Sequence, residues 1–398
     1  MNEVAILGVA MHPWGKIKDK SVPELNLEVA QKALKDAGLE WKDIQFVVAG
    51  SDPWSGVDGL LAGCRLSQKI GNNGIPVVNV YNACATGGYA LKTAQAYINS
   101  GFCDYVLVVA ASISPSGFFG VTNVGREDDP NDLDSQRFRI LGLTNPTGFA
   151  FMATYRMHHY GMTENDLALV KVKNSKFGAL NPLARFKKPF TVEDVLKSPM
   201  VTYPLRLYEL CATSDGAAAI VLSSMKVAKK HTRKPVRLAS VGIATPKYPD
   251  PRSGGYGLDI ASDSGALDFN NGMGVRAAYN AYEEAGIGPE DLDLAEVYDL
   301  SSAFELGWYE EIGLCKRGDA EKLLREGATG IGGRMPVNTS GGCASFGEAI
   351  PAQAMAQVCE LTWQMRGVSG PRQVEGAKVG FTVNAGKQGN CSATVVKK

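Results

Sequence analysis

Short apolar runs alternate with helix-period stretches along this chain of 398 residues. Four of the runs predict buried strands. They are VAILGVA, FVVAG, PVVNV and YVLVVAA, at residues 4–10, 46–50, 76–80 and 105–111. Between the first two, Leu27, Ala30 and Leu34 form a helical stripe, which a capping box at Ser21 opens and Gly38 ends. Alternating strands and helices indicate right-handed crossovers, and therefore an α/β fold with a mostly parallel sheet covered by helices.

The same pattern contains two weak copies of itself. A spacing of two alanines, a glycine and an aspartate occurs twice. The first copy has Ala33, Ala37, Gly38 and Asp43, and the second has Ala281, Ala285, Gly286 and Asp291. A second echo links VNVYNACATGG (residues 78–88) with VNTSGGCASFG (residues 337–347), so that Cys84 and Cys343 occupy equal positions. Two related halves, each with a cysteine in a glycine-rich turn after a strand, indicate a site where the halves meet.

The length predicts more than one domain. We expect a first half from residues 1–112 and 205–235 and a second half from residues 236–398. Residues 113–204 have no counterpart in the second half, are rich in Gly, Pro, Asn and charge, and are expected to form an inserted loop domain. Insertions of this length often serve as lids, binding loops or oligomer contacts. Its middle is basic, which fits either a solvated loop or a surface for a phosphorylated ligand.

Composition excludes several classes of protein. The net charge is zero, so we expect neither nucleic acid nor an anionic membrane as a partner. No apolar run is long enough to span a bilayer, and the N-terminus enters a strand without a charged-then-apolar leader. The eight cysteines include no CxxC pair and no Cys/His cluster at ligand spacing. This favours reduced thiols in the cytoplasm and no metal site.

Cys84 is the strongest candidate for chemistry. It follows a buried strand and precedes Ala85-Thr86-Gly87-Gly88, which opens a helix. A thiol at a helix N-terminus is stabilised as thiolate by the helix dipole and by nearby N–H groups. Glycines there let a carbonyl group approach the backbone closely enough for an oxyanion hole. A small buried cysteine is the alternative, but the repeated glycine-rich setting favours a nucleophile.

The chain resembles the thiolase superfamily, in the branch of thiolases related to sterol carrier protein. The resemblance covers essentially the whole chain and rests on four segments taken together. They are NACATG (residues 82–87), KNSKFGALNPLARF (residues 173–186), TSDGAAAIVL (residues 213–222) and NAGKQGNCSATVV (residues 384–396). The resemblance implies two βαβαβαββ halves in a five-layer αβαβα sandwich. It also implies a homodimer, and acyl transfer on coenzyme A thioesters with coenzyme A as co-substrate and no bound cofactor.

Such thiolases attack a β-ketoacyl-CoA with the cysteine that matches Cys84, release a shorter acyl-CoA, and pass the acyl-enzyme to a second coenzyme A. Within the branch, the chain most resembles thiolases that split 2-benzoylsuccinyl-CoA into benzoyl-CoA and succinyl-CoA in anaerobic toluene breakdown. Thiolases of this branch with altered active sites resemble proteins that bind a small partner subunit of the DUF35 type. Such a subunit combines a zinc ribbon with an OB-fold. The resemblance therefore implies such a partner and a heterotetramer.

Three positions depart from the family pattern. Glu348 stands where the family commonly has an activating histidine, Tyr298 begins the segment that reads HDCF or NEAF in relatives, and Asn384 replaces a second acid/base cysteine. A Glu348 buried beside Cys84 would have its pKa raised toward neutrality and could act as the base. Tyr298 could donate to the thioester oxygen, and Cys343 could take the missing acid/base role. Capping or packing roles are the alternatives for all three.

The family match also assigns binding roles. Gly386 is expected to form the oxyanion hole together with the amide of Cys84. Lys173, Lys176, Arg185 and Asn384 are candidates for binding substrate or coenzyme A.

Three functions follow from these residues. The first is thiolysis, which the intact NACATG segment favours. The second is a retro-aldolase acting on a β-hydroxyacyl-CoA, which Tyr298 and the absent histidines favour. The third is a non-catalytic acyl-CoA-binding subunit, which only the absent histidines favour. The sequence leaves open the acyl chain, the direction of reaction, the choice between Glu348 and Cys343 as base, and whether a partner is obligatory.

Overall fold

A computed structural model describes residues 3–115, 144–232, 235–247, 272–386 and 389–398. Within these ranges the main sheet has the strand order β3-β2-β4-β7-β1-β8-β11-β10-β9. The first half contributes β1 (Val4–Met11), β2 (Phe46–Gly50), β3 (Val77–Val80), β4 (Tyr105–Ser112) and β7 (Gly216–Ser224). The second half contributes β8 (Val236–Ala244), β9 (Leu294–Val297), β10 (Val379–Gly386) and β11 (Asn390–Lys397). The two halves join where β1 pairs with β8 at their first residues.

Within each half, all strands but one run in the same direction. In the first half β2 is parallel to β3 and β4, and β7 runs against β4 and β1. In the second half β9 is parallel to β10, and β11 runs against β10 and β8. The two halves thus repeat the same arrangement, in which the last strand is inserted antiparallel to its neighbours.

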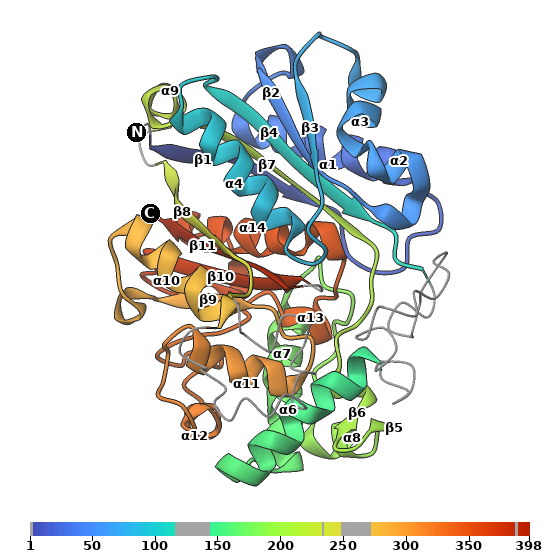
Figure 1. Cartoon of the computed structure of the whole chain (residues 1–398), viewed down its shortest axis with the longest axis vertical. Helices are drawn as coiled ribbons and strands as arrows, with labels where there is room; N and C mark the ends of the chain where they lie inside the picture. Colours follow the sequence, from blue (N-terminus) through green and yellow to red (C-terminus); the bar gives the residue numbers. More distant parts are fainter. Residues whose placement is uncertain (1–2, 116–143, 233–234, 248–271, 387–388) are drawn as a thin grey trace.

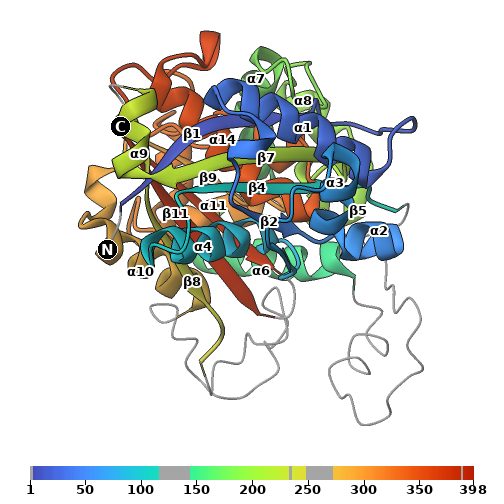
Figure 2. The same ribbon diagram turned by 90° about the horizontal axis from the view of Figure 1, so that it is seen from above.

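The helices make this a sandwich of five layers, as expected from the sequence. The outer face of the first half carries α1 (Val22–Ala37) and α3 (Ala62–Ile70), and that of the second half carries α10 (Met273–Ala285). Between the halves lie α4 (Thr86–Asn99) and α14 (Gln353–Arg366), which contact strands of both (Figure 1). Viewed from above, α1 and α4 lie on opposite sides of the first-half strands (Figure 2). Helices α4 and α14 therefore form the central layer, which contacts the strands of both copies of the repeat.

The repeated residues have repeated structural roles. Gly38 and Gly286 end α1 and α10 in the left-handed conformation, with φ of 66° and 64°. Asp43 and Asp291 each accept a hydrogen bond from the backbone N–H three residues earlier, at 2.8 Å and 2.9 Å, and close the short turn before β2 or β9. The spacing found in the sequence is thus a helix end and a turn built twice.

The copies differ in how helix and strand pack. A side chain at Gly8 would lie 2.2 Å from the carbonyl oxygen of Ala33, and one at Gly242 would lie 2.1 Å from that of Ala277. The sequence repeat matches Ala33 with Ala281, so the contact in the second half lies one helical turn earlier. Because a β-carbon would overlap backbone in both places, only glycine permits these close approaches.

The second half also lacks a full third strand. In the first half β3 pairs with β2 over four residues, whereas in the second half the strand expected around Val337 is a single parallel bridge to Ala295. After it comes the short helix α13 (Gly342–Ser345), which carries Cys343. The second-half turn thus retains its cysteine while losing most of its strand pairing.

An insertion separates β4 from β7, whereas the corresponding β10 and β11 follow one another closely in the sequence. Its described elements are α6 (Asn145–Tyr160), α7 (Glu164–Leu180), α8 (Val192–Leu196), β5 (Met200–Thr202) and β6 (Leu205–Arg206). Helices α6 and α7 pack against α11 (Ser302–Glu311), and α7 also contacts α12 (Ala320–Arg325) and α13 (Figure 1). The insertion therefore lies on the second half, although the first half contains it in sequence. The domain limits at residues 113–204 and 235–236 stay predictions.

Buried ion pairs reinforce this contact. Arg156 of α6 binds Glu310 and Glu321 with nitrogen–oxygen distances of 2.6 Å and 2.7 Å, and all three side chains are almost fully buried. Removing one partner of such a group leaves an uncompensated buried charge, which is strongly destabilising. The insertion is therefore fixed to α11 and α12. No helix of the described ranges has the length and apolarity that crossing a bilayer requires.

Candidate active site

Cys84 lies in a tight turn between β3 and α4. The residue before it, Ala83, has φ of 46°, a left-handed conformation that costs energy for any residue with a side chain. Thr86 fastens the turn, because its hydroxyl accepts from the amide of Asn82 at 2.8 Å and donates to the carbonyl of Ala83 at 2.6 Å. The thiol is thus held at the N-terminal end of α4 by a strained and specifically bonded turn.

The second cysteine turn has the same backbone feature. Gly342, which precedes Cys343, is left-handed with φ of 61°. Cys343 itself begins a helical turn and donates its amide hydrogen to Asp299 Oδ1 at 2.7 Å. The two cysteines are thus related by geometry as well as by sequence.

The Cys84 turn is pressed against the second half. A side chain at Gly386 of β10 would lie 2.6 Å from the carbonyl oxygen of Asn82, and one at Gly88 of α4 would lie 2.1 Å from Ser392 Oγ of β11. Only glycines allow the chains to approach so closely. Gly386 therefore lies directly beside the Cys84 turn, and its oxyanion role stays a prediction.

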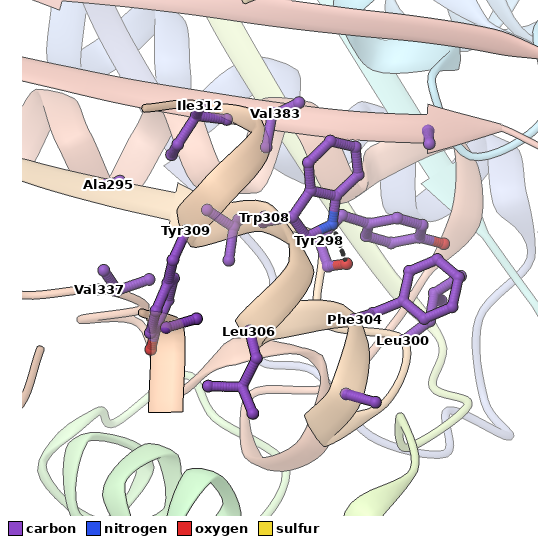
Figure 3. Close-up of a cluster of buried hydrophobic side chains, with 14 of the residues drawn as sticks. Ala295, Tyr298, Leu300, Phe304, Leu306, Trp308, Tyr309, Ile312, Val337 and Val383 are labelled. Atoms are coloured by element: carbon purple, nitrogen blue, oxygen red, sulfur yellow. Dashed lines mark hydrogen bonds between the residues drawn. The ribbon is translucent and has the colours of Figure 1, made fainter. Parts of the chain in front are cut away.

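Cys84 is 5% exposed and belongs to a cluster of buried residues that spans the second half and the insertion. The cluster includes Phe149 and Phe304, whose rings meet edge to face at 5.1 Å, as well as Tyr298. Figure 3 shows Tyr298 and Phe304 among the side chains of this cluster, with Trp308 donating to the carbonyl of Tyr298 at 2.9 Å. The buried cluster that includes the thiol is therefore apolar and contains several aromatic side chains.

Glu348 is buried in this environment and is bonded to Tyr298. The phenol of Tyr298 donates to Glu348 Oε1, and both side chains are almost wholly shielded from solvent. Burial raises the pKa of Glu348 to about 7, while the hydrogen bonds of Tyr298 and Cys211 oppose the rise. The other oxygen, Oε2, is buried and accepts no N–H or O–H hydrogen bond from the described residues. A carboxylate in this state can take up a proton near neutral pH.

Cys211 was not singled out from the sequence, yet it lies inside the site. Its amide donates to the carbonyl of Leu300 at 3.0 Å, and the next amide, that of Ala212, donates to the carbonyl of Cys343 at 2.9 Å. Burial, followed by the charges of Glu348, Asp299 and Cys84, raises the pKa of its thiol well above the ordinary value. In the sequence, the position of Cys211 just before the TSDG segment was the one indication of a functional role. Neither a strand pattern nor a glycine-rich turn adjoins this cysteine.

Cys343 is less accessible than either of the other two thiols. It is fully buried, and burial together with Asp299 and Glu348 raises its pKa well above the ordinary value. The structure thus places it near Asp299, Glu348 and Cys211, and its acid/base role stays a prediction.

A buried polar network supports the Tyr298–Asp299 segment. Asn174 of α7 donates to Asp299 at 3.0 Å and to Glu305 at 2.6 Å, and Glu305 pairs with Lys173 at 2.8 Å. Burial and the charge of Glu305 raise the pKa of Asp299 to about 8. Within the described ranges, no three His, Cys, Asp or Glu side chains are arranged to hold a metal ion.

This network also includes Lys173, whose binding role stays a prediction. Its ammonium is buried and occupied by Glu305 and by the carbonyl of Val337 at 2.7 Å, so it serves the interior and does not face a surface phosphate. Asn384 is likewise buried, where its amide group donates to Gln357. The substrate-binding role expected for these two residues gains no support from their positions.

The other basic candidates differ from each other. Lys176 is exposed on α7. Arg185 is half-buried, lies over the ring of Phe186, and donates to the carbonyl of Thr213 and to Ser214 Oγ at 3.3 Å. The binding roles of both residues stay predictions, and Lys176 is the more exposed of the two.

Lys171 of α7 binds the turn that contains Cys343. Its ammonium is buried and donates to the carbonyl of Ala344 at 2.5 Å and to Ser345 Oγ at 3.1 Å. Burial lowers its pKa to about 8. This lysine of the basic segment therefore supports α13.

Comparison with known proteins agrees with this architecture. The family model described as Thiolase C-terminal domain-like matches residues 260–398, and that of stage V sporulation protein AD matches residues 16–116. The chain is 34% identical to an acetyl-CoA acetyltransferase of Methanothermobacter thermautotrophicus, with 99% of this chain and 98% of the relative aligned. It is 33% identical to sterol carrier protein 2 of Bos taurus, over 100% of this chain and 72% of the relative.

A third relative is the benzoylsuccinyl-CoA thiolase subunit BbsB of Thauera aromatica, 31% identical over 94% of this chain and 91% of the relative. Among solved structures, an Ltp2-ChsH2(DUF35) aldolase superposes with a TM-score of 0.84 at 24% identity, covering 100% of this chain and 98% of the other. Human mitochondrial 3-ketoacyl-CoA thiolase superposes with a TM-score of 0.71 at 16% identity, covering 100% and 99%. These two likenesses show the fold, and the three relatives show the family. The chain belongs to the thiolase family and is an acyltransferase.

Proposed function

We propose that this protein is a thiolase that cleaves a β-ketoacyl-CoA with coenzyme A, through an acyl-enzyme on Cys84. The observation that carries the proposal is the position of Cys84. It lies on a strained turn at the start of α4, held against Gly386 of the second half. The glutamate–tyrosine pair of Glu348 and Tyr298 occupies the same buried cluster.

The reaction follows from these groups. Glu348 takes the proton of the Cys84 thiol, and the thiolate attacks the β-carbonyl carbon of the substrate. The amides of Cys84 and Gly386 stabilise the oxyanion. The bond between the α- and β-carbons then breaks, its electron pair becomes a C–H bond at the α-carbon, and a shorter acyl-CoA leaves. Coenzyme A then takes the acyl group from Cys84.

We propose coenzyme A as co-substrate and no other cofactor. The exposed Lys176 and the half-buried Arg185 are our candidates for its phosphates. For the acyl group we propose 2-benzoylsuccinyl-CoA, giving benzoyl-CoA and succinyl-CoA. Likeness to the Thauera subunit supports this substrate, and so does the presence of Phe149 and Phe304 in the cluster around Cys84.

The edge of the sheet supports a homodimer. β3 ends the strand order and leaves its outer side unpaired among the described strands. Exposed apolar side chains follow β2 close by in sequence, namely Trp54, Val57, Leu60 and Leu61. Open edge strands invite pairing with another chain. Charged substitution of Leu60 and Leu61 should therefore shift the mass measured by light scattering from dimer to monomer.

We further propose a small DUF35-type partner that completes a heterotetramer. The aldolase structure with the same fold is named as a complex with such a subunit. Co-purification of the two chains from one host tests it. The cytoplasmic location expected from the thiols stays a prediction, and no disulfide joins any of the eight cysteines, all of which lie in the described ranges.

A retro-aldolase acting on a β-hydroxyacyl-CoA is the second candidate. The hydrogen bond from Tyr298 to Glu348 favours it, because a tyrosine with a carboxylate partner can exchange the hydroxyl proton of such a substrate. A non-catalytic acyl-CoA-binding subunit is the third candidate, and the Glu348–Tyr298 pair weighs against it.

Mass spectrometry distinguishes these functions. The protein is incubated with a panel of β-ketoacyl-CoA and β-hydroxyacyl-CoA compounds, including 2-benzoylsuccinyl-CoA, and digested. A thiolase gains an acyl mass on the peptide of Cys84 from the keto compounds. An aldolase cleaves the β-hydroxyacyl-CoA compounds and adds no acyl mass to the Cys84 peptide. A binding subunit neither cleaves any compound nor gains an acyl mass.

A further inference from the structure

The thiolase proposal lacks one part. Thiolysis needs a group that protonates the α-carbon when the carbon–carbon bond breaks, and then removes the proton of coenzyme A. At the position where the family resemblance implies a second acid/base cysteine for many thiolases, this chain has Asn384, whose amide is buried and bonded to Gln357. A carboxamide is neither an acid nor a base at neutral pH, so Asn384 does not fill this role.

The segment around Cys211 crosses the site between the two stretches that hold the other candidates. On one side Cys211 donates its amide to Leu300, and Leu210 forms a bridge with Ser301. On the other side Ala212 is bonded to Cys343 and to the amide of Glu348, at 2.9 Å and 3.0 Å. These bonds on both sides fix the Cys211 backbone between the Tyr298–Ser301 and Cys343–Glu348 segments.

The thiol shares the buried cluster of Cys84, Tyr298 and Cys343. Exposure separates Cys211 from the other thiols of the cluster besides Cys84, because Cys211 is 8% exposed whereas Cys343 and Cys391 are 0% exposed. In the same place the buried Glu348 Oε2 receives no N–H or O–H donor from the described residues, and the Cys211 side chain is a hydrogen-bond partner of that carboxyl group.

We infer that Cys211 is the second reacting thiol of this site, donating a proton to the α-carbon of the leaving acyl-CoA and then taking one from coenzyme A. The inference rests on the proposed thiolysis. The proton balance closes. The S–H bond of Cys211 breaks as the α-carbon gains its C–H bond. The Cys211 thiolate then removes the proton of coenzyme A, whose sulfur attacks the acyl carbon and releases Cys84 as thiolate.

The surroundings suit a donor of this kind. Burial and the nearby charges of Glu348, Asp299 and Cys84 keep the Cys211 thiol protonated at neutral pH. It is therefore in the form that the cleavage step requires, and its conjugate thiolate is a strong base for the second step.

Proton exchange at the α-carbon tests the inference separately from thiolysis. Acetyl-CoA and succinyl-CoA are incubated with enzyme in D2O, and deuterium at the α-carbon is measured by mass spectrometry. The variants are Cys211→Ala, Cys211→Ser, Cys343→Ala, Cys84→Ala and, as a buried-thiol control in the central layer, Cys359→Ala. Circular dichroism and thermal unfolding establish that each variant is folded, with Cys211→Ser as the closest isostere.

Cys211→Ala should lower the exchange rate by about 10²-fold or more, the size of a lost acid/base group. Cys359→Ala should retain exchange, whereas Cys84→Ala serves to show whether exchange depends on the thiol that is acylated. The inference is overturned if Cys211→Ala and Cys211→Ser exchange within about threefold of the wild type, if Cys343→Ala alone loses exchange, or if an enzyme that acylates Cys84 exchanges no deuterium. Failure of the thiolase proposal gives a different result, namely no acyl mass on Cys84 of the wild type.

Discussion

Tyr298 donates a hydrogen bond to Glu348 from inside the protein, where neither side chain has appreciable contact with solvent. Burial alone would hold the carboxyl group protonated, and the phenol counteracts part of that effect. The result is a pKa of about 7 for Glu348, which is well placed for proton transfer under physiological conditions.

Replacing Cys84 with Ala should abolish thiolysis and the acyl mass on the enzyme, because no other thiol lies in the strained turn at the start of α4. Iodoacetamide should label Cys84 in the wild type, with Cys64→Ala as a control that keeps both activity and Cys84 labelling. An active Cys84→Ala enzyme labelled elsewhere would exclude the acyl-enzyme and favour the aldolase.

Replacing Glu348 with Gln should slow acylation of Cys84 by about 10²-fold or more, since the amide cannot accept the proton. In the wild type, the acylation rate should rise with pH through about 7, because the base must be ionised. Rapid-quench measurement of acyl-enzyme from pH 5.5 to 8.5 checks both points. An unchanged rate and profile in Glu348→Gln would assign the residue a structural role.

The same substitution should change stability in a pH-dependent way. The folded-state pKa of Glu348 is raised from 4.5 to about 7, so the folded protein binds this proton more tightly than the unfolded chain. Its contribution is therefore present below the unfolded pKa and is lost as pH rises toward 7. Relative to Glu348→Gln, the wild type should lose about 3 kcal/mol of unfolding free energy between pH 4.5 and 7. Urea unfolding of both proteins measures this difference, and parallel curves would contradict it.

Replacing Tyr298 with Phe removes the phenol that lowers the pKa of Glu348. The acidic limb of the acylation profile should therefore move to higher pH, while the acylation rate well above the new pKa stays close to that of the wild type. An aldolase would instead lose its rate at every pH, because the tyrosine would take part in the chemistry. Acylation and aldol cleavage rates of Tyr298→Phe, measured from pH 6 to 9, separate the two.

Replacing Gly386 with Ala should disturb the Cys84 turn, because the new methyl group would lie 2.6 Å from the Asn82 carbonyl. Overpacking of this kind costs about 1–3 kcal/mol. Gly15→Ala is the matched control, since nothing lies within 4 Å of a side chain there. Thermal unfolding and acylation of both variants check the prediction, and equal behaviour would show that the turn has room to move.

Local signals in the sequence predicted much of the fold. The capping box at Ser21, the helix end at Gly38 and the repeated aspartates at 43 and 291 act over three or four residues, so their outcome follows from spacing alone. The two cysteine turns followed from the same repeat. The weakening of the strand around Val337 to one bridge did not, because it depends on tertiary packing.

The site was less predictable than the fold. A charged side chain in a basic segment suggested a surface role for Lys173, but its partner Glu305 is distant in sequence and buries it. Cys211 was missed for a similar reason, since its position depends on backbone bonds to Leu300 and, through Ala212, to Cys343. Long-range pairing of this kind leaves no periodic trace in a single sequence.

The meeting of the two copies at Cys84 has a consequence for how the protein can be divided. The proposed nucleophile Cys84 comes from one copy, whereas the carboxylate of Glu348, the phenol of Tyr298 and the glycine beside the turn come from the other. Neither copy alone contains a complete set of reacting groups. Fragments cut between β7 and β8 would regain activity only by reassembling with each other.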